Sequence, residues 1–262
     1  MTHPSSLLRG RALITGGSSG LGLTFARQLA ERGLDLVLVA RNAERLDEAA
    51  AALRSTGVEV ETLVADLADD AGVAAVSQRL GSASSPVSVF VNNAGAGLYA
   101  KMTTADPTEL LAGAQLMALA PMVLGGAAAA AMKERGEGVI INTSSMSGAA
   151  PMGAYSAIKA FVRVWSDSLA IEAAAFGVQV VTFIPGWVRT EFHARTGVST
   201  SSIPDFLWLD ADRVVAECLA DVEKGKTSST PSKRFKLIGF LAKHAPAPVV
   251  AAAVKKLNKG RR

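Results

Sequence analysis

Short apolar runs alternate along the chain with longer stretches of helical periodicity. The apolar runs predict six strands, at residues 11–15, 34–40, 58–65, 87–91, 139–143 and 178–184. Helices are predicted between them, from the first turn to about residue 32, then to 56, and near 70–80, 108–133 and 155–175. Nearly every strand position is apolar, so we expect strands covered on both faces. This alternation predicts an α/β fold with a doubly wound parallel sheet.

The pattern changes after the sixth predicted strand. Residues 187–210 are rich in Ser and Thr and show no regular period, which is typical of either a lid over a site or a disordered segment. The apolar and aromatic residues at 206–208 indicate that part of this lid packs, as a helix. A helix at 211–223 and a polar linker at 227–232 precede a tail, and we expect one domain spanning residues 1–262.

Composition narrows the class of protein. The 262 residues are 49% hydrophobic and 19% charged without a Gly-X-Y or heptad period, which excludes collagen, coiled coils and disorder. Cys218 is the only cysteine, which excludes a disulfide scaffold and indicates the reducing cytoplasm. Residues 1–11 are polar up to Ser6 and contain no long apolar run, so no signal peptide is expected. His3, His193 and His244 have no metal-ligand spacing, so no metal site is expected.

Residues 110–132 carry no formal charge and are long enough to cross a membrane. Pro121, Gly113 and the Gly125-Gly126 pair interrupt this stretch, and its five successive alanines are only mildly apolar. We therefore predict a helix buried between the sheet and a neighbouring subunit of a homodimer or homotetramer.

Charge is divided unevenly along the chain. The formal net charge is +4, yet residues 224–262 hold 11 of the 27 Lys and Arg residues and none of the 23 Asp and Glu residues. The body therefore has a net charge of −7 and the tail is strongly basic. The tail is also amphipathic at 232–243, which leaves open a helix packed on the body or a partner subunit, or peripheral contact with the anionic inner face of a membrane. Nucleic-acid binding is not favoured, because no recognised module accompanies the charge.

A glycine-rich turn follows the first predicted strand and precedes the first helix. It reads Thr15-Gly-Gly-Ser-Ser-Gly-Leu-Gly22, a G-x-x-x-G-x-G spacing. Glycines here allow the backbone to approach a pyrophosphate, whose charge is stabilised by the helix N-terminus. Taken by itself, the pattern is also compatible with a purely structural turn.

Three further motifs follow in order: Asn92-Asn-Ala-Gly95, Tyr155-x-x-x-Lys159 and Pro185-Gly186. With the glycine turn, they make residues 11–190 resemble the short-chain dehydrogenase/reductase family. The resemblance implies a Rossmann-like sheet and an oxidoreductase that transfers a hydride between a nicotinamide and a carbonyl or alcohol. The C-terminal third is similar to actinobacterial reductases of the mycolate-reductase type, which act on long-chain 3-oxoacyl groups. Apolar residues of the lid agree with an apolar ketone: Phe192, Ile203, Phe206, Leu207 and Trp208.

The resemblance also implies which residues hold the cofactor. They are Gly16, Ser18, Ser19, Gly20, Leu21, Gly22, Asp66, Leu67, Asn93, Ala94, Gly95, Tyr155, Lys159, Pro185, Gly186, Val188 and Thr190. The second strand is followed by Arg41, with no acid before Glu44. An acid there would bind the ribose 2′-hydroxyl of NAD, whereas Arg accommodates a 2′-phosphate, so NADP(H) is preferred to NAD(H). Arg41 could instead be a solvated charge at the start of a helix.

Tyr155 and Lys159 lie four residues apart and share one face of a helix. A phenol can protonate the developing alkoxide, but its ordinary pKa of about 10 is high, and we expect a neighbouring ammonium to lower that pKa. The family also uses a serine to orient the carbonyl oxygen. Ser145 matches that position better than Ser144 or Ser147, although the interval to Tyr155 is shorter than in the family.

Met117 stands where the family has an asparagine that holds a water near the lysine. A thioether is a poor hydrogen-bond acceptor. Either another group such as Gln115 replaces it or the proton relay is weakened. The alternative function is therefore a catalytically weakened NADP(H)-binding protein with a regulatory or structural role, against which the intact Tyr155 and Lys159 argue.

Overall fold

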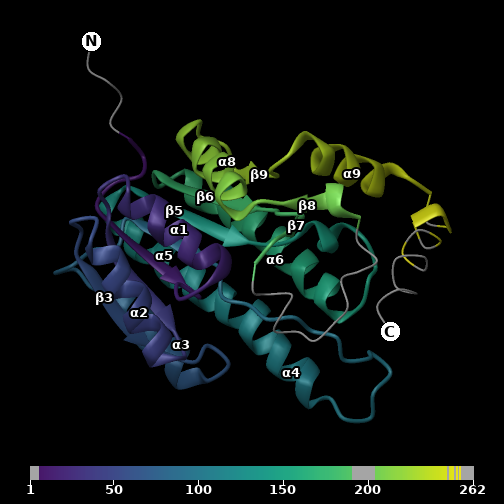
Figure 1. Ribbon diagram of the computed structural model, residues 1–262, viewed down its shortest axis with the longest axis horizontal. Coiled ribbons are helices and arrows are strands. Elements are labelled where there is room, and N and C mark those ends of the chain that lie inside the picture. Colours follow the sequence, from purple (N-terminus) through teal and green to yellow (C-terminus); the bar gives the residue numbers. More distant parts are fainter. Residues whose placement is uncertain (1–5, 191–203, 247, 251, 253, 255–262) are drawn as a thin grey trace.

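A computed structural model of the protein describes residues 6–190, 204–246, 248–250, 252 and 254. Its centre is a parallel sheet of seven strands in the order β3-β2-β1-β4-β5-β6-β9 (Figure 1). The strands are β1 Arg11–Thr15, β2 Asp35–Ala40, β3 Val60–Val64, β4 Val89–Asn92, β5 Gly138–Thr143, β6 Val178–Phe183 and β9 Ser228–Ser229. A separate parallel pair joins β7 Trp187–Val188 to β8 Trp208–Leu209. All six predicted strands are confirmed, the first with its predicted ends and the other five with ends shifted by one or two residues.

Helices cover both faces of this sheet. They are α1 Gly20–Ala30, α2 Ala43–Arg54, α3 Asp70–Leu80, α4 Thr108–Ala114, α5 Ala120–Arg135, α6 Ala154–Ala174, α8 Ala211–Glu223 and α9 Lys233–His244. Alternate strand residues pack on α1, α2 and α8 on one face and on α3, α5 and α6 on the other. The fold is therefore the expected Rossmann-like, doubly wound α/β fold. The strand order reverses at β1, which lies between β2 and β4, and ligands of such sheets bind at the carboxyl ends of the strands around this point.

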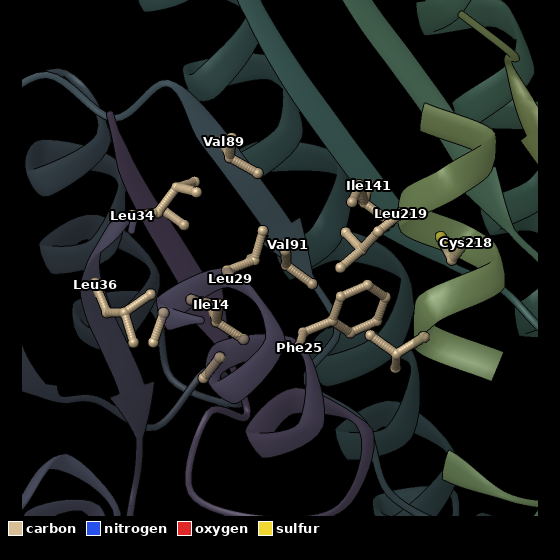
Figure 2. Close-up of a cluster of buried hydrophobic side chains, with 14 of the residues drawn as sticks. Ile14, Phe25, Leu29, Leu34, Leu36, Val89, Val91, Ile141, Cys218 and Leu219 are labelled. Atoms are coloured by element: carbon tan, nitrogen blue, oxygen red, sulfur yellow. The ribbon is translucent and has the colours of Figure 1, made fainter. Parts of the chain in front are cut away.

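Large apolar side chains fill the face between the sheet, α1 and α8 (Figure 2). The Phe25 ring of α1 meets the Phe183 ring of β6 edge to face, with centroids 5.5 Å apart and an interplanar angle of 87°. Cys218 and Leu219 of α8 close this layer from the other side. Figure 2 shows how these side chains fix α1, which follows the glycine turn, against the sheet.

Among the described residues, one helix, Thr108–Arg135, is long and apolar enough to cross a membrane. It consists of α4, a π-helical turn at Gln115–Leu119 and α5. Its inner residues, including Leu124 and Met132, pack in the core against the sheet. The segment is therefore a core helix whose outer side remains exposed, as at Val123.

Two expectations for the C-terminal third need correction. The predicted polar linker at 227–232 contains β9, which pairs with β6. Its Ser229 hydroxyl donates to the buried Asp221 carboxylate at 2.8 Å, a polar contact that leaves no apolar signature in the sequence. The expected helical lid is, where described, β7, a 3-10 turn and β8, and an Arg189–Asp205 ion pair joins its two ends. The lid residues Phe192, His193 and Ile203 lie outside the described residues.

Phe25→Ala tests the packing of α1. Phe25 is fully buried, so we expect the free energy of unfolding to fall by about 3–5 kcal/mol. Phe206→Ala removes the same ring from an exposed position and serves as the control. Urea unfolding monitored by circular dichroism measures both. Equal losses for the two variants would contradict the packing described for α1.

Candidate active site

The glycine turn between β1 and α1 folds back on itself. The N–H groups of Gly16 and Gly17 both donate to the carbonyl of Val39 in β2, at 2.8 and 3.1 Å. Gly16 has a φ of +70°, and a Cβ on Gly22 would lie 2.1 Å from the Gly16 carbonyl oxygen. The turn therefore requires glycine at both positions and brings bare backbone to the N-terminus of α1.

This turn fits the pyrophosphate of a dinucleotide. Ser19 precedes α1 in an extended conformation, and among the described residues no side chain caps that end of the helix. Ser18, Ser19 and Gly20 are half-buried in the turn, while Leu21 packs its side chain against the core. A helix N-terminus whose N–H groups lack a side-chain acceptor, behind backbone that no Cβ obstructs, is a binding site for anions.

Thr15 joins the end of β1 to the segment after β4. Its hydroxyl oxygen accepts from the backbone N–H groups of Asn93 and Ala94, at 2.9 and 3.0 Å. The Asn93 side-chain amide donates in return to the Thr15 carbonyl, at 3.1 Å. Asn93, Ala94 and Gly95 are thereby held beside Gly16. No role for Thr15 is predicted from the sequence. Its position directly before the first glycine of the turn is the sequence feature that could have indicated this contact.

Arg41 directly follows β2, two residues after Val39, whose carbonyl accepts from the glycine turn. The side chain of Arg41 is exposed, and Asn42 caps α2 by accepting from the Arg45 N–H at 2.8 Å. A positive charge at a helix N-terminus is unfavourable, so α2 does not explain Arg41. Its position beside the turn does suit a second phosphate.

Asp66 and Leu67 follow β3, two strands away from β1 along the same edge. The Asp66 carboxylate accepts from the Ala68 N–H at 2.9 Å, and Leu67 is buried. These two residues therefore lie two strands away from the glycine turn. The segments after β1 and β4, by contrast, are in direct contact with each other.

Ser145, Tyr155 and Lys159 gather at the carboxyl ends of β5 and β6. The Tyr155 hydroxyl forms a hydrogen bond with the Ser145 hydroxyl. Ser147 donates to the same Ser145 oxygen through its hydroxyl at 2.9 Å, whereas the buried Ser144 hydroxyl donates to the Lys159 carbonyl at 2.7 Å. Among these serines, Ser145 is thus the one placed against the phenol.

The ammonium group of Lys159 is almost fully enclosed. The residue is 5% exposed, and its Nζ donates to the Thr143 carbonyl at 2.9 Å. The same nitrogen lies 5.8 Å from the centroid of the Tyr155 ring. Burial disfavours the charged form and lowers the pKa of Lys159 from 10.5 to about 8.

Tyr155 departs from the expected electrostatics. We expected the neighbouring ammonium to lower its pKa, but desolvation dominates and raises the pKa of Tyr155 above its ordinary value. The Ser145 hydrogen bond opposes this rise, and nearby Tyr99 adds to it. The phenol is therefore protonated at neutral pH in the described chain.

Met117 lies in the π-helical turn between α4 and α5, and is 1% exposed. Its sulfur accepts a weak hydrogen bond from the Ala96 N–H at 3.4 Å. The proposed substitute, Gln115, donates its amide to Asp70 at 3.2 Å, on α3. Pro121 has no N–H, so the Met117 carbonyl lacks its ordinary α-helical donor four residues ahead.

The break in this helix is fastened to the sheet. The Asn92 side-chain amide donates to the Pro121 carbonyl at 2.9 Å and to the Asn142 side chain at 3.1 Å. Asn142 donates in turn to the Ser166 hydroxyl of α6 at 3.0 Å. Asn92 was quoted in the motif without a role, and this buried contact explains why an amide stands there.

The segment 185–190 closes the site on its remaining side. The Pro185 carbonyl accepts from the Met146 N–H at 2.9 Å, next to Ser145. Gly186 packs under an aromatic ring from α9, and Val188 is buried in β7. The Thr190 side chain lies 3.5 Å from the position of a Cβ on Gly20. The segment thus touches both the serine loop and the glycine turn.

Comparisons with known proteins agree with this arrangement. A family model described as short chain dehydrogenase matches residues 11–199. Gluconate 5-dehydrogenase of Gluconobacter oxydans is 35% identical over 222 residues, which cover 79% of this chain and 82% of that protein. Ketoacyl reductase HetN of Nostoc is 28% identical over 222 residues, covering 82% and 76%. A solved short-chain dehydrogenase from Sphingobium yanoikuyae in complex with NADPH superposes with a TM-score of 0.81 at 33% identity, covering 97% of both chains.

Lys159→Met tests the burial of the ammonium. Between pH 8 and 10.5 the unfolded chain binds more protons at Lys159 than the native chain, so the free energy of unfolding of the wild type rises with pH there. The full rise is about 3 kcal/mol. We expect Lys159→Met to lack it and the exposed Lys133→Met to retain it. Urea unfolding at several pH values measures the rise, and an identical pH dependence in both variants would contradict the burial.

Proposed function

The chain belongs to the short-chain dehydrogenase/reductase family, and from this we propose that it is an NADP(H)-dependent oxidoreductase of apolar carbonyl compounds or the corresponding alcohols. The observation that carries the proposal is the convergence of Tyr155, Ser145 and Lys159 at the carboxyl ends of β5 and β6, on the same edge of the parallel sheet as the glycine turn. Family membership makes the protein an oxidoreductase, and the comparisons give no support to the regulatory alternative.

Tyr155 is the proton donor in this proposal. Its raised pKa keeps the phenol protonated, so Tyr155 has a proton to give to the oxygen of a carbonyl undergoing reduction, and positive charge beside the phenol would strengthen it as an acid. The Ser145 hydroxyl, already bonded to Tyr155, would orient that oxygen. When bound, the nicotinamide supplies or accepts the hydride, and its oxidised form adds a positive charge that favours phenolate for the reverse reaction.

Lys159 would return the proton to Tyr155. A pKa of about 8 places its ammonium close to balance with its amine, which suits repeated proton transfer near neutral pH. We infer that the Met117 carbonyl, whose α-helical donor is missing because Pro121 has no N–H, accepts from a water at this position. The backbone can therefore replace the missing asparagine side chain.

NADP(H) preference rests on Arg41 and on the absence of an acid between β2 and Glu44. The NADPH complex of the Sphingobium relative supports it. In our proposal, Gly16 to Gly22 bind the pyrophosphate and Asn93 to Gly95 adjoin the ribose of the adenosine. Asp66 and Leu67 adjoin the adenine, and Pro185 to Thr190 contact the nicotinamide amide.

The substrate class rests on this chain's own side chains. The two relatives carry names for unlike substrates, gluconate and a ketoacyl group. Tyr99 and Met102 follow β4 and are exposed, and Tyr99 lies close enough to Tyr155 to affect its pKa. Phe206 is exposed at the end of the lid segment. These side chains favour an apolar ketone, such as a long-chain 3-oxoacyl group.

We also propose a cytoplasmic homodimer or homotetramer. The outer side of the long core helix exposes Leu119 and Val123, and α6 exposes Val164 and Ile171. Apolar surface of this extent on two helices is suited to a subunit interface. The single, buried Cys218 agrees with a reducing compartment.

Tyr155→Phe tests the chemistry. The variant removes only the hydroxyl, so we expect NADPH to bind nearly as before while turnover falls well below a tenth of the wild-type rate. Loss of NADPH absorbance against 3-oxoacyl thioesters, steroids, aldehydes and quinones measures turnover, and fluorescence titration measures binding. Retention of more than about a tenth, a loss below about 1.4 kcal/mol, would show that Tyr155 is not the acid.

A pair of serine variants accompanies that experiment as its matched control. Ser145→Ala removes the hydroxyl that is bonded to the phenol, whereas Ser147→Ala removes a hydroxyl that reaches only Ser145. We expect the first variant to lose far more turnover than the second.

Arg41→Ala tests the choice of cofactor. Only NADPH carries the 2′-phosphate, so we expect its dissociation constant to rise by at least tenfold while that of NADH changes little. Fluorescence titration of both cofactors on the wild type and the variant gives the two ratios. Equal weakening of NADPH and NADH would assign Arg41 a structural role.

A further inference from the structure

The inner side of α9 is anchored over the candidate active site. Phe235 is fully buried, with its ring on Gly186 and 5.8 Å from the ring of Trp187. Gly239 lies against Met146, the residue after Ser145. Helix α9 is therefore in direct contact with both loops that border the site.

The outer side of α9 is apolar as well. Leu237, Phe240 and Leu241 are 59%, 60% and 54% exposed. Their spacing of three and four residues places them on one stripe of the helix. Surface helices ordinarily present polar residues to water, so three large apolar side chains on the solvent side need a partner.

Basic side chains surround this stripe. Lys233, Arg234 and Lys236 are exposed on the same helix. The Arg234 guanidinium donates to the Phe206 carbonyl, which brings a further apolar side chain, 63% exposed, to the edge of α9. We call the seven residues the basic apolar face: Phe206, Lys233, Arg234, Lys236, Leu237, Phe240 and Leu241. Figure 1 shows α9 at the periphery of the molecule, away from the sheet.

Charge distinguishes the partners that could cover this face. A second copy of the chain in a two-fold interface would oppose the three basic residues to themselves, which is repulsive. Residues 224–262 carry 11 basic and no acidic residues, whereas the remainder of the chain has an excess of acid. A partner must therefore be anionic and must also accept Leu and Phe side chains. The interface of an anionic bilayer offers both, since phosphates lie above the acyl chains.

We propose that the basic apolar face docks the protein on an anionic lipid bilayer. Leu237, Phe240 and Leu241 enter the boundary between headgroups and acyl chains, and the basic residues contact lipid phosphates. Because the opposite side of α9 contacts Gly186 and Met146, docking would hold these two loops of the site close to the membrane surface. An apolar ketone could then reach the site without crossing water, a consequence that rests on the proposed function.

Co-sedimentation with vesicles tests the docking on the full chain. We expect binding to vesicles of phosphatidylcholine with phosphatidylglycerol at 0.1 M salt. Binding should fall at least tenfold on pure phosphatidylcholine and at 1 M salt, where the Debye length decreases from about 10 Å to about 3 Å. Absence of binding to the anionic vesicles, or equal binding to neutral ones, would overturn the proposal.

A double variant tests the apolar stripe. Leu237→Ser with Phe240→Ser should lose at least tenfold in anionic-vesicle binding, whereas Leu7→Ser with Val64→Ser changes two exposed apolar residues outside α9 and should bind as the wild type. Equal binding of both double variants would overturn the role of the stripe. A smaller oligomer for the α9 variant without lipid would overturn the proposal in favour of a second copy.

An activity measurement separates this proposal from the proposed function. With a water-soluble ketone, both double variants should oxidise NADPH at the wild-type rate, since none of these residues contacts the reacting groups. If the wild type binds anionic vesicles yet reduces no carbonyl compound, the docking stands and the proposed function fails. If the wild type reduces a carbonyl compound but binds no vesicles, the proposed function stands and the docking is overturned.

Discussion

The hydroxyl of Thr15 is the interaction on which the position of the site depends. It holds the N–H groups of Asn93 and Ala94 at the point where the strand order of the sheet reverses. Connections on the two sides of such a point leave in opposite directions, which opens a crevice at the strand ends. Without this hydroxyl, these two hydrogen bonds would not join the glycine turn to the segment after β4. One side-chain oxygen thus aligns both walls of the proposed dinucleotide site.

Stability and chemistry conflict in α6. Tyr155 and Lys159 both lie where burial disfavours their charged forms, so folding moves their pKa values in opposite directions. The helix tolerates an enclosed ammonium because Val162, Ser166 and Ala170 bury the rest of the same helix face. A site that destabilises its own helix is common where function requires unusual protonation.

The parts of the structure that the sequence predicts are stabilised by different interactions from the parts that it does not predict. Strands covered on both faces leave continuous apolar runs, which is why β1 to β6 were found, and short motifs located the strand ends. A two-residue strand held by the contact of Ser229 with Asp221 leaves no such run. The spacing of Tyr155 and Lys159 predicted a shared face but not its depth, and it could not show that Lys159 Nζ donates to the Thr143 carbonyl. The expectation of a lowered Tyr155 pKa is therefore wrong for the described chain, in which burial raises that pKa.

The contact between Gly186 and the ring of Phe235 affects how the chain folds during synthesis. Chains emerge from the ribosome N-terminus first, and the residues that line the site up to Thr190 are made before α9 exists. Until Phe235 arrives, Gly186 and Trp187 lack the ring that covers them, and β6 lacks its outer neighbour β9. A nascent chain that lacks β9 and α9 thus has an incomplete sheet edge and an uncovered loop at Gly186 and Trp187. A chain truncated before Lys233 would therefore expose aromatic surface that the complete chain covers, and exposed apolar surface of this kind is prone to aggregation.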